Sequence, residues 1–260
     1  MPYRLYWTEG ATVRWSDDFE DDELDAGYTT RGAGWEIAQV DGSGVARSRN
    51  AVAAGYAELR RTVNLIRPGL VEFRLRLDVP DLTGGLPGRG RLRFLVDGDE
   101  AAVWVGSELW LPVRLAVAAG TRTLAWRFED VDESGAWAAI DDLRVIQCAA
   151  IPSVFHVADY TPPRPFRSAV VHQPLQGPAR IQAIAGGGTT VSLGVYVVGP
   201  EAYATLIRHL QRRLPLVWED EGGRVYSGTA GPDLEVRQNG GLYSVRFDLI
   251  AQETAGVGAL

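Results

Sequence analysis

The sequence contains no lysine, one cysteine, one methionine and three histidines in 260 residues. A single cysteine, Cys148, excludes an internal disulfide, and we expect it to be a small buried hydrophobic side chain. No run of about 18 apolar residues is present, so no transmembrane helix is predicted. Residues 1–10 lack the apolar stretch of a signal peptide. Together these absences favour folding in a cytoplasm, without membrane insertion.

The basic residues are all arginine, 26 of them against 33 acidic residues, which gives a net charge of −7. The acidic excess lies in residues 1–150, with 24 acidic and 17 basic side chains, whereas residues 151–260 have nine of each. No basic stripe is present, and a net acidic chain without one is not expected to bind nucleic acid.

Residues 15–148 have the pattern of short strands. Leu70–Leu77 alternates apolar and charged residues, which is typical of a sheet with one face in water. Arg91–Val96 repeats the pattern and ends at Asp97-Gly98, a hairpin signal. Further strands are predicted at 110–117, 121–128 and 138–146. Many strands between glycine and proline turns, without a convincing helix, predict a β-sandwich.

The remainder of the chain combines strands with one helix. Pro200 suits the first position of a helix and Glu201 complements its dipole, while apolar residues recur at helical spacing up to Leu214, before Pro215. Strands are predicted at 168–172, 179–184, 190–198, 216–218, 224–228, 234–237 and 242–252. One helix among about seven strands predicts a small α+β barrel.

These patterns predict a mainly β protein with an N-terminal jelly-roll β-sandwich and a small C-terminal α+β split barrel. The expected divisions are an N-terminal strand or arm at 1–14, the sandwich at 15–148, a Pro-rich connector at 149–178, the barrel at 179–254 and a tail at 255–260. Residues 1–14 join either the rear domain or a neighbouring molecule, and the sequence leaves this open.

The densest charge cluster is the acidic run Asp17–Asp25. One interpretation is a solvated loop, and the other is a calcium site, because hard cations need several oxygen ligands. A calcium site would need a partner carboxylate from elsewhere, and Asp141-Asp142 in the last predicted sandwich strand is the best candidate. We expect these two adjacent strand residues to point to opposite faces.

Between Trp15 and Gln147 a set of segments follows one another in order, namely Asp17–Glu20, Gly34-Trp35, Pro68–Arg76, Leu92–Gly98, Trp110, Gly120–Trp126 and Trp137–Leu143. In this order of segments residues 15–147 resemble MAM-like and concanavalin-like jelly rolls of bacteria. The family's Tyr-X-Lys-Asp stretch is replaced here by Arg127–Asp130. The resemblance implies binding of glycans or proteins and a structural calcium, for which it indicates Glu20 and Asp141.

Four segments of the C-terminal part follow one another in order: Val195–Tyr203, Leu214–Asp220, Gly223–Gly228 and Leu242–Leu249. With these segments the C-terminal part resembles the split-barrel domain of phage tail-tip and distal tail proteins. It implies rings that join through exposed strands. It also implies a virion tail location after assembly in the bacterial cytoplasm, with this protein itself (three-fold or six-fold) and other tail proteins as partners.

Catalysis is not predicted. His156, His172 and His209 lack metal-ligand spacing, and no Gly-X-Ser-X-Gly elbow, phosphate loop or Cys-His pair is present. Trp104, Trp110 and Trp126 lie in strand patterns and are expected in the core, so no exposed aromatic pair indicates a sugar site. We therefore expect a non-enzymatic phage tail component whose jelly roll decorates the tail or binds host-surface glycan. The alternative is a carbohydrate-binding module of a bacterial surface or secreted protein.

Overall fold

The computed structural model divides the chain into two compact units. One unit contains residues 11–147, and the other contains residues 1–10 together with 148–253. The structure describes residues 4–21, 23–49, 55–80, 90–130, 135–151, 154–160, 164–166, 169–172, 180–183, 188–220 and 223–254. Within this part of the chain, no helix is long and apolar enough to cross a membrane.

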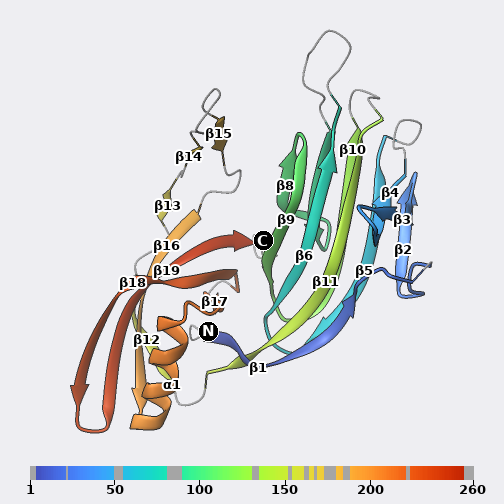
Figure 1. Cartoon of the computed structure of the whole chain (residues 1–260). Helices are drawn as coiled ribbons and strands as arrows, with labels where there is room; N and C mark the ends of the chain where they lie inside the picture. The colour runs from blue at the N-terminus through green and yellow to red at the C-terminus, as the bar shows by residue number, and fades with distance from the viewer. Residues whose placement is uncertain are drawn as a thin grey trace. The chain divides into compact units, whose positions relative to one another are not determined.

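The unit of residues 11–147 is a jelly-roll β-sandwich of two sheets (Figure 1). In the first sheet the strands pair in the order β9-β6-β11-β4-β3, and β1 also pairs with β11. The second sheet has the order β2-β5-β10-β7-β8. The first sheet contains β1 (Arg4–Asp17), β3 (Trp35–Val40), β4 (Ser43–Ser48), β6 (Gly69–Asp78), β9 (Glu108–Val117) and β11 (Trp137–Ala150). The second contains β2 (Tyr28–Gly32), β5 (Ala57–Leu65), β7 (Gly90–Val96), β8 (Asp99–Val105) and β10 (Gly120–Asp130).

Two hairpins in this unit are set by residues in the left-handed region. Asp41-Gly42 joins β3 to β4 with φ of 53° and 86°, and Asp97-Gly98 joins β7 to β8 with φ of 56° and 98°. Aspartate and glycine tolerate this conformation, and two such residues match the twist of the flanking strands. The hairpin predicted at Asp97-Gly98 is therefore confirmed.

The core of the sandwich is built from the alternating apolar positions of both sheets. Trp126 on β10 is fully buried; its ring centroid lies 5.7 Å from that of Phe73 on β6 and 5.3 Å from that of Phe94 on β7. Trp104 packs against the same cluster, at 6.0 Å from Phe73. The core position expected for Trp126 is confirmed, whereas Trp104 is half-buried at the border of this core.

The second unit, residues 1–10 and 148–253, is called the rear unit below. It has a sheet of order β12-β16-β19-β18-β17-β1, to which the first residues of β1 belong. Arg4–Trp7 pair antiparallel with Glu219–Leu216, so the N-terminal strand completes the rear unit of its own chain. The other strands are β12 (Val154–Tyr160), β13 (Arg164–Phe166), β14 (Ala169–His172), β15 (Arg180–Ala183), β16 (Gly188–Val198), β17 (Leu216–Glu219), β18 (Val225–Asn239) and β19 (Leu242–Thr254). Residues 154–160, expected within a connector, thus form a sheet strand that pairs with β16.

The helix α1 (Pro200–Gln211) confirms the predicted helix and its first residue. Gly199 precedes it at φ 91°, Pro200 needs no hydrogen-bond acceptor in the first turn, and Glu201 lies near the positive end of the dipole. Leu206 and Leu210 are buried, and the Tyr203 ring stacks on Tyr243 of β19 with centroids 4.2 Å apart. The apolar stripe of the helix therefore packs on the sheet.

We expect Trp126→Ala to destabilise the sandwich by about 3–5 kcal/mol, because the substitution leaves a cavity among buried aromatic rings. Urea unfolding followed by fluorescence measures this loss. Trp137→Ala is the matched control, since Trp137 is only half-buried and lies outside this core. Equal losses for the two variants would contradict the core described here.

Candidate functional site

Two tryptophans lie on the outer face of the first sheet of the sandwich. Trp110 on β9 and Trp137 on β11 are half-buried and pack against a small cluster of Val40, Val45 and Ala139, separate from the main core. The expectation that Trp110 lies in the core is therefore wrong. The reason is the alternation of side chains along a strand. Trp110 and Arg114 are four residues apart on β9, so they point to the same face of the sheet, and Arg114 is exposed.

Two arginines flank the indole of Trp137. Arg47 on β4 and Arg76 on β6 are both paired in register with Ala139, one on each side of β11. Their guanidinium carbons lie 5.8 Å and 5.5 Å from the centroid of the Trp137 ring, within the range of cation–π attraction. Trp137 is thus held by the strands on both sides of its own.

Trp110 is connected to the same arrangement through Asp41. The indole N–H of Trp110 donates to Oδ2 of Asp41 at 3.2 Å, and Arg76 forms an ion pair with the same oxygen. The guanidinium carbon of Arg74 lies 5.0 Å from the Trp110 ring centroid, and its Nη1 lies 3.4 Å from Oδ2 of Asp142. We call Trp110, Trp137, Arg47, Arg74 and Arg76 the Trp–Arg stack.

The charges of the Trp–Arg stack are balanced by carboxylates. Arg47 is paired with Glu36 at 3.3 Å, Arg76 with Asp41, and Arg74 with Asp142. Guanidinium N–H donors and carboxylate acceptors therefore lie beside two large aromatic rings on one sheet face. Such a surface suits a ligand with apolar patches and many hydroxyl groups, and its planar groups are fixed by mutual contacts.

The structure describes both residues predicted for calcium, Glu20 and Asp141, and gives them different partners. Oε1 of Glu20 accepts hydrogen bonds from the Ser43 hydroxyl at 2.7 Å and the Gly44 N–H at 3.2 Å. A Cβ at Gly44 would lie 2.4 Å from the carbonyl oxygen of Phe19, so only glycine lets the acidic run approach β4 here. Burial raises the pKa of Asp141, and the charges of Asp142 and Glu20 contribute to the rise.

Asp141 and Asp142 do not alternate as expected for neighbours in a regular strand. The pairing of β11 with β6 shifts between Asp141 and Arg144, and Asp142 has φ 50°. Because of this bulge, both carboxylates lie near Nη1 of Arg74, at 3.8 Å and 3.4 Å. The expectation that they point to opposite faces is therefore wrong.

The acidic run also borders a groove of about 700 Å³, lined in part by Asp17, Asp18, Asp21, Asp25 and Asp142. Calcium takes roughly six to eight oxygen ligands. In the part of the chain that the structure describes, no three Asp, Glu, His or Cys side chains form a group that fits a metal ion. Glu20 and Asp141 alone are an incomplete ligand set, and the calcium site stays a prediction.

The one described histidine side chain has the surroundings of a structural residue. His209 is buried on α1, its Nε2 lies 3.1 Å from the carbonyl oxygen of Pro215, and burial lowers its pKa. Cys148 is buried, as expected. The side chains of His156 and His172 lie outside the described residues.

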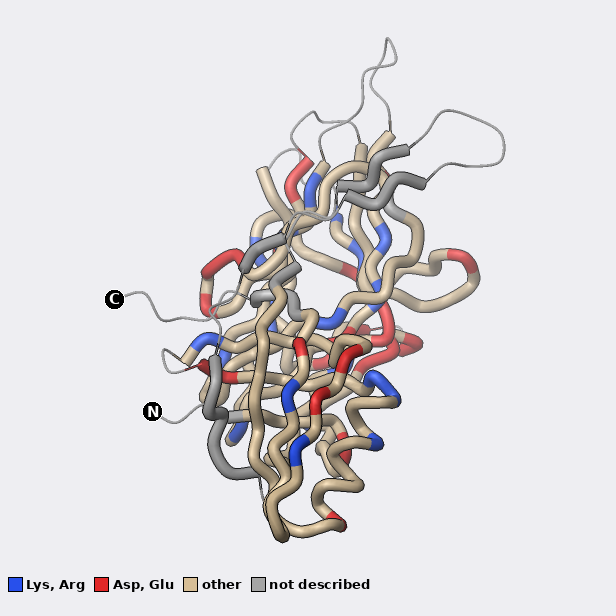
Figure 2. The backbone as a smooth tube through the Cα atoms, turned by 90° about the vertical axis from the view of Figure 1, so that its left-hand side faces the viewer, with Lys and Arg blue, Asp and Glu red and all other residues tan. Residues whose placement is uncertain are grey.

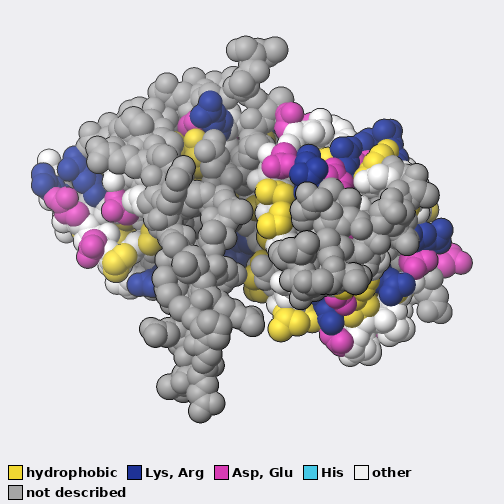
Figure 3. Space-filling view, turned by 90° about the horizontal axis from the view of Figure 1, so that it is seen from above, with side chains coloured by type: hydrophobic (Ala, Val, Ile, Leu, Met, Phe, Trp, Pro, Cys, Tyr) yellow, Lys and Arg dark blue, Asp and Glu magenta, His cyan; other side chains and the backbone are white. Residues whose placement is uncertain are grey.

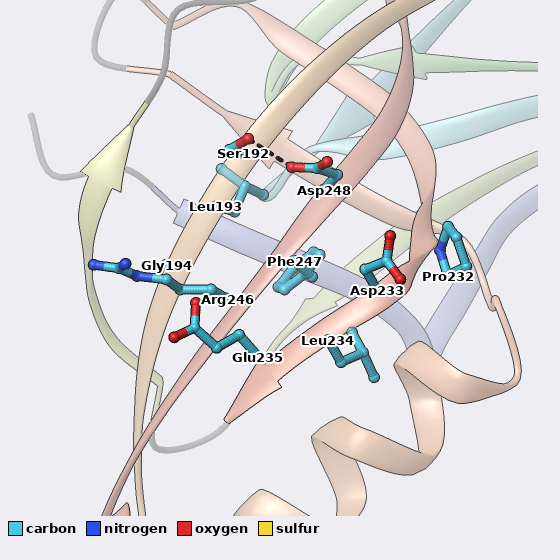
Figure 4. A pocket seen from close by; sticks show the side chains of 10 residues that line it. All are labelled: Ser192, Leu193, Gly194, Pro232, Asp233, Leu234, Glu235, Arg246, Phe247 and Asp248. Atoms are coloured by element: carbon cyan, nitrogen blue, oxygen red, sulfur yellow. Dashed lines mark hydrogen bonds between the residues drawn. The ribbon is translucent and has the colours of Figure 1, made fainter. Parts of the chain in front are cut away.

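A second groove, of about 740 Å³, lies on the rear unit between β16, β18 and β19 (Figure 4). Asp233, Glu235, Arg246 and Asp248 border it, and the Ser192 hydroxyl donates to Oδ1 of Asp248 at 2.5 Å. Figure 4 shows the residues that line the groove, with the Ser192–Asp248 hydrogen bond as a dashed line. The groove has charges of both signs, and none of the described residues that line it is a histidine or cysteine.

No family model and no curated protein matches the chain. Solved structures resemble about half of it. The K3 adhesin domain of Lys-gingipain from Porphyromonas gingivalis W83 is 15% identical with a TM-score of 0.42, covering 53% of this chain and 99% of that one. The CBM22-1 xylan-binding domain of Paenibacillus barcinonensis Xyn10C is 17% identical with a TM-score of 0.36, covering 53% and 95%. A cellulose-specific CBM28 is 16% identical with a TM-score of 0.36, covering 49% and 91%. Scores this low assign neither a family nor a ligand.

The raised pKa of Asp141 and the calcium prediction are tested together by Asp141→Asn. The stability that a raised carboxyl pKa gives is present below the unfolded pKa of about 4 and is lost as pH rises through the folded pKa. At neutral pH with chelator we therefore expect the variant to melt at the same temperature as the parent or higher. If calcium binds, it raises the melting temperature of the parent more than that of the variant. Equal curves with calcium and with chelator for the parent would reject the metal.

Proposed function

We propose that this protein is a non-enzymatic binding protein whose jelly roll binds carbohydrate at the Trp–Arg stack. The observation that supports this proposal is a pair of half-buried tryptophans outside the core, each with an arginine within 6 Å of its ring and a carboxylate next to that arginine. Sugars present C–H groups that pack on indoles and hydroxyls that both donate and accept hydrogen bonds.

The geometry of the Trp–Arg stack also favours binding over catalysis. The stacked guanidinium groups are each held by a carboxylate, so Asp41 and Asp142 are engaged in ion pairs. Glycoside hydrolysis needs two carboxyl groups facing each other across the scissile bond, about 5–9 Å apart. In the described residues of this face, Asp141 is 3% exposed and lies next to Asp142 in sequence, which does not leave room for a substrate between them.

We expect Trp110→Ala and Trp137→Ala to weaken binding of a glycan found by array screening by about tenfold or more, because a buried aromatic contact contributes about 1.5–3 kcal/mol. Isothermal titration with the best array hit measures this. Thr121→Ala, an exposed position on β10 of the second sheet, is the matched control and should bind as the parent does. An array without hits, with and without calcium, would reject the proposal.

A second candidate function, compatible with the first, is that of a ring-forming phage tail component. One observation on the rear unit favours it: among the described residues, β17 pairs with β18 only at residues 225–228, whereas β18 extends to Asn239. Val198, Val236, Leu242 and Ile250 in this unit are 39–49% exposed. An exposed strand edge next to apolar side chains recruits a further strand, here from another copy or a tail protein.

We expect native mass spectrometry to give a three-fold or six-fold particle if the β18 edge joins copies, and negative-stain images to show rings. Val236→Lys should reduce the particle to monomers, because a charge on an edge strand opposes strand addition. Thr121→Lys, on the sandwich, is the matched control. A monomer at every concentration, with no ring in the presence of tail proteins, would contradict this second candidate.

A further inference from the structure

One buried carboxylate on the second sheet of the sandwich holds two arginines side by side. Glu58 on β5 has no exposed side-chain area, although it lies on the outer face of its sheet. Nε of Arg60 donates to its Oε1, and Nε of Arg127 on β10 donates to its Oε2 at 2.6 Å. Such charge-assisted hydrogen bonds fix the position of both guanidinium groups.

The contacts of Arg60 and Arg127 leave most of their donors available. Both use Nε to bind Glu58, and among the described residues neither donates a hydrogen bond from its Nη atoms. Their side chains are 24% and 31% exposed, so water reaches them. Since a guanidinium group has five N–H donors, the Nη atoms of this pair can bind a further acceptor.

The same face has more positive than negative charge. The register places Arg31, Glu58, Arg127 and Arg93 in one row across β2, β5, β10 and β7, so Arg127 lies directly opposite Arg93. Like charges directly opposite are unfavourable in a sheet. Arg93 lies 3.6 Å and 3.4 Å from its carboxylate partners Glu129 and Glu100. The arginines of this face are Arg31, Arg60, Arg91, Arg93 and Arg127, against the carboxylates Glu58, Glu100 and Glu129.

The pair lies next to a small residue of β10. Ala125 is opposite Arg60 on one side and Leu95 on the other, and Ala125 and Leu95 are both buried, so the exposed donors beside them belong to Arg60 and Arg127. The guanidinium carbon of Arg127 lies over the ring of Tyr56, 5.0 Å from its centroid. Figure 3 shows, on one face of the molecule, how charged side chains of both signs lie next to hydrophobic ones.

We propose that the Arg60–Arg127 pair is an oxyanion site that binds the carboxylate or sulfate group of an acidic glycan. Planar guanidinium forks match these groups in a bidentate way. The chain as a whole has a net charge of −7, and Figure 2 shows basic and acidic residues intermixed along the backbone, which disfavours a nucleic-acid backbone as the ligand. The glycan part of this inference rests on the proposed function, whereas the oxyanion site itself does not.

The oxyanion site is tested with inorganic sulfate as the probe. We expect the protein to bind sulfate in isothermal titration at constant ionic strength, with chloride as the reference anion. Replacing both arginines while keeping Glu58 would leave a buried carboxylate without a partner and endanger folding. The variant is therefore Glu58→Gln/Arg60→Gln/Arg127→Gln, which should bind sulfate about tenfold more weakly or not at all.

Glu72→Gln/Arg114→Gln is the matched control, because Nε of Arg114 donates to Glu72 at 2.5 Å on the first sheet. It should retain parental sulfate binding. Circular dichroism and melting curves establish that both variants fold. Absence of sulfate binding by the parent, or equal binding by the folded triple variant, would overturn the oxyanion site.

The glycan class is tested by comparing dextran sulfate and polygalacturonate with uncharged dextran in affinity electrophoresis. Retardation by the acidic polymers, lost in the triple variant and kept in Glu72→Gln/Arg114→Gln, is the expected result. Binding of sulfate without retardation by either acidic polymer would overturn the glycan assignment. The triple variant should still bind the uncharged glycan that array screening assigns to the Trp–Arg stack. In that case, loss of the oxyanion site leaves the proposed function intact.

Discussion

The packing of two sheets around Trp126, Phe73 and Phe94 decides which side of every sandwich strand faces water. Because side chains alternate along a strand, burying one set of positions fixes the opposite set at the surface. Trp110 and Trp137 are outward on the first sheet for this reason, and Glu58, Arg60 and Arg127 are outward on the second. The chemistry of both surfaces is thus a consequence of the register that the core imposes.

The outer faces of the two sandwich sheets differ in how their arginine charges are balanced. On the first sheet each arginine of the Trp–Arg stack has a carboxylate next to it, and aromatic rings separate the pairs. On the second sheet one buried carboxylate serves two arginines, so positive charge accumulates. The first arrangement favours an uncharged polar ligand, whereas the second favours an anion.

Local patterns in the sequence predict the helix and the strands well. They predict poorly which strands pair and which side chains meet across them. The helix beginning at Pro200 follows from proline at its start and from apolar spacing, both of which are local. The outward position of Trp110 is missed when tryptophan is weighed by its hydrophobicity alone, although its parity with Arg114 indicates the surface. The bulge at Asp142 depends on how β11 meets β6 and has no local sequence signal. The pairing of Arg60 and Arg127 on Glu58 likewise joins β5 to β10 and requires the register between them.

Arg4 pairs with Glu219, and the whole sandwich is encoded between them. On the ribosome the first strand therefore emerges long before its partner exists, and loop closure over such a distance is slow. The sandwich has all its strands synthesised before β17 leaves the exit tunnel. β1 and β11, which contain the two ends of this segment, Ala11 and Gln147, are neighbouring strands, so folding of the sandwich shortens the effective loop that β1 must close. The pairing of β1 with β17 then has a lower entropy cost than its separation in sequence implies.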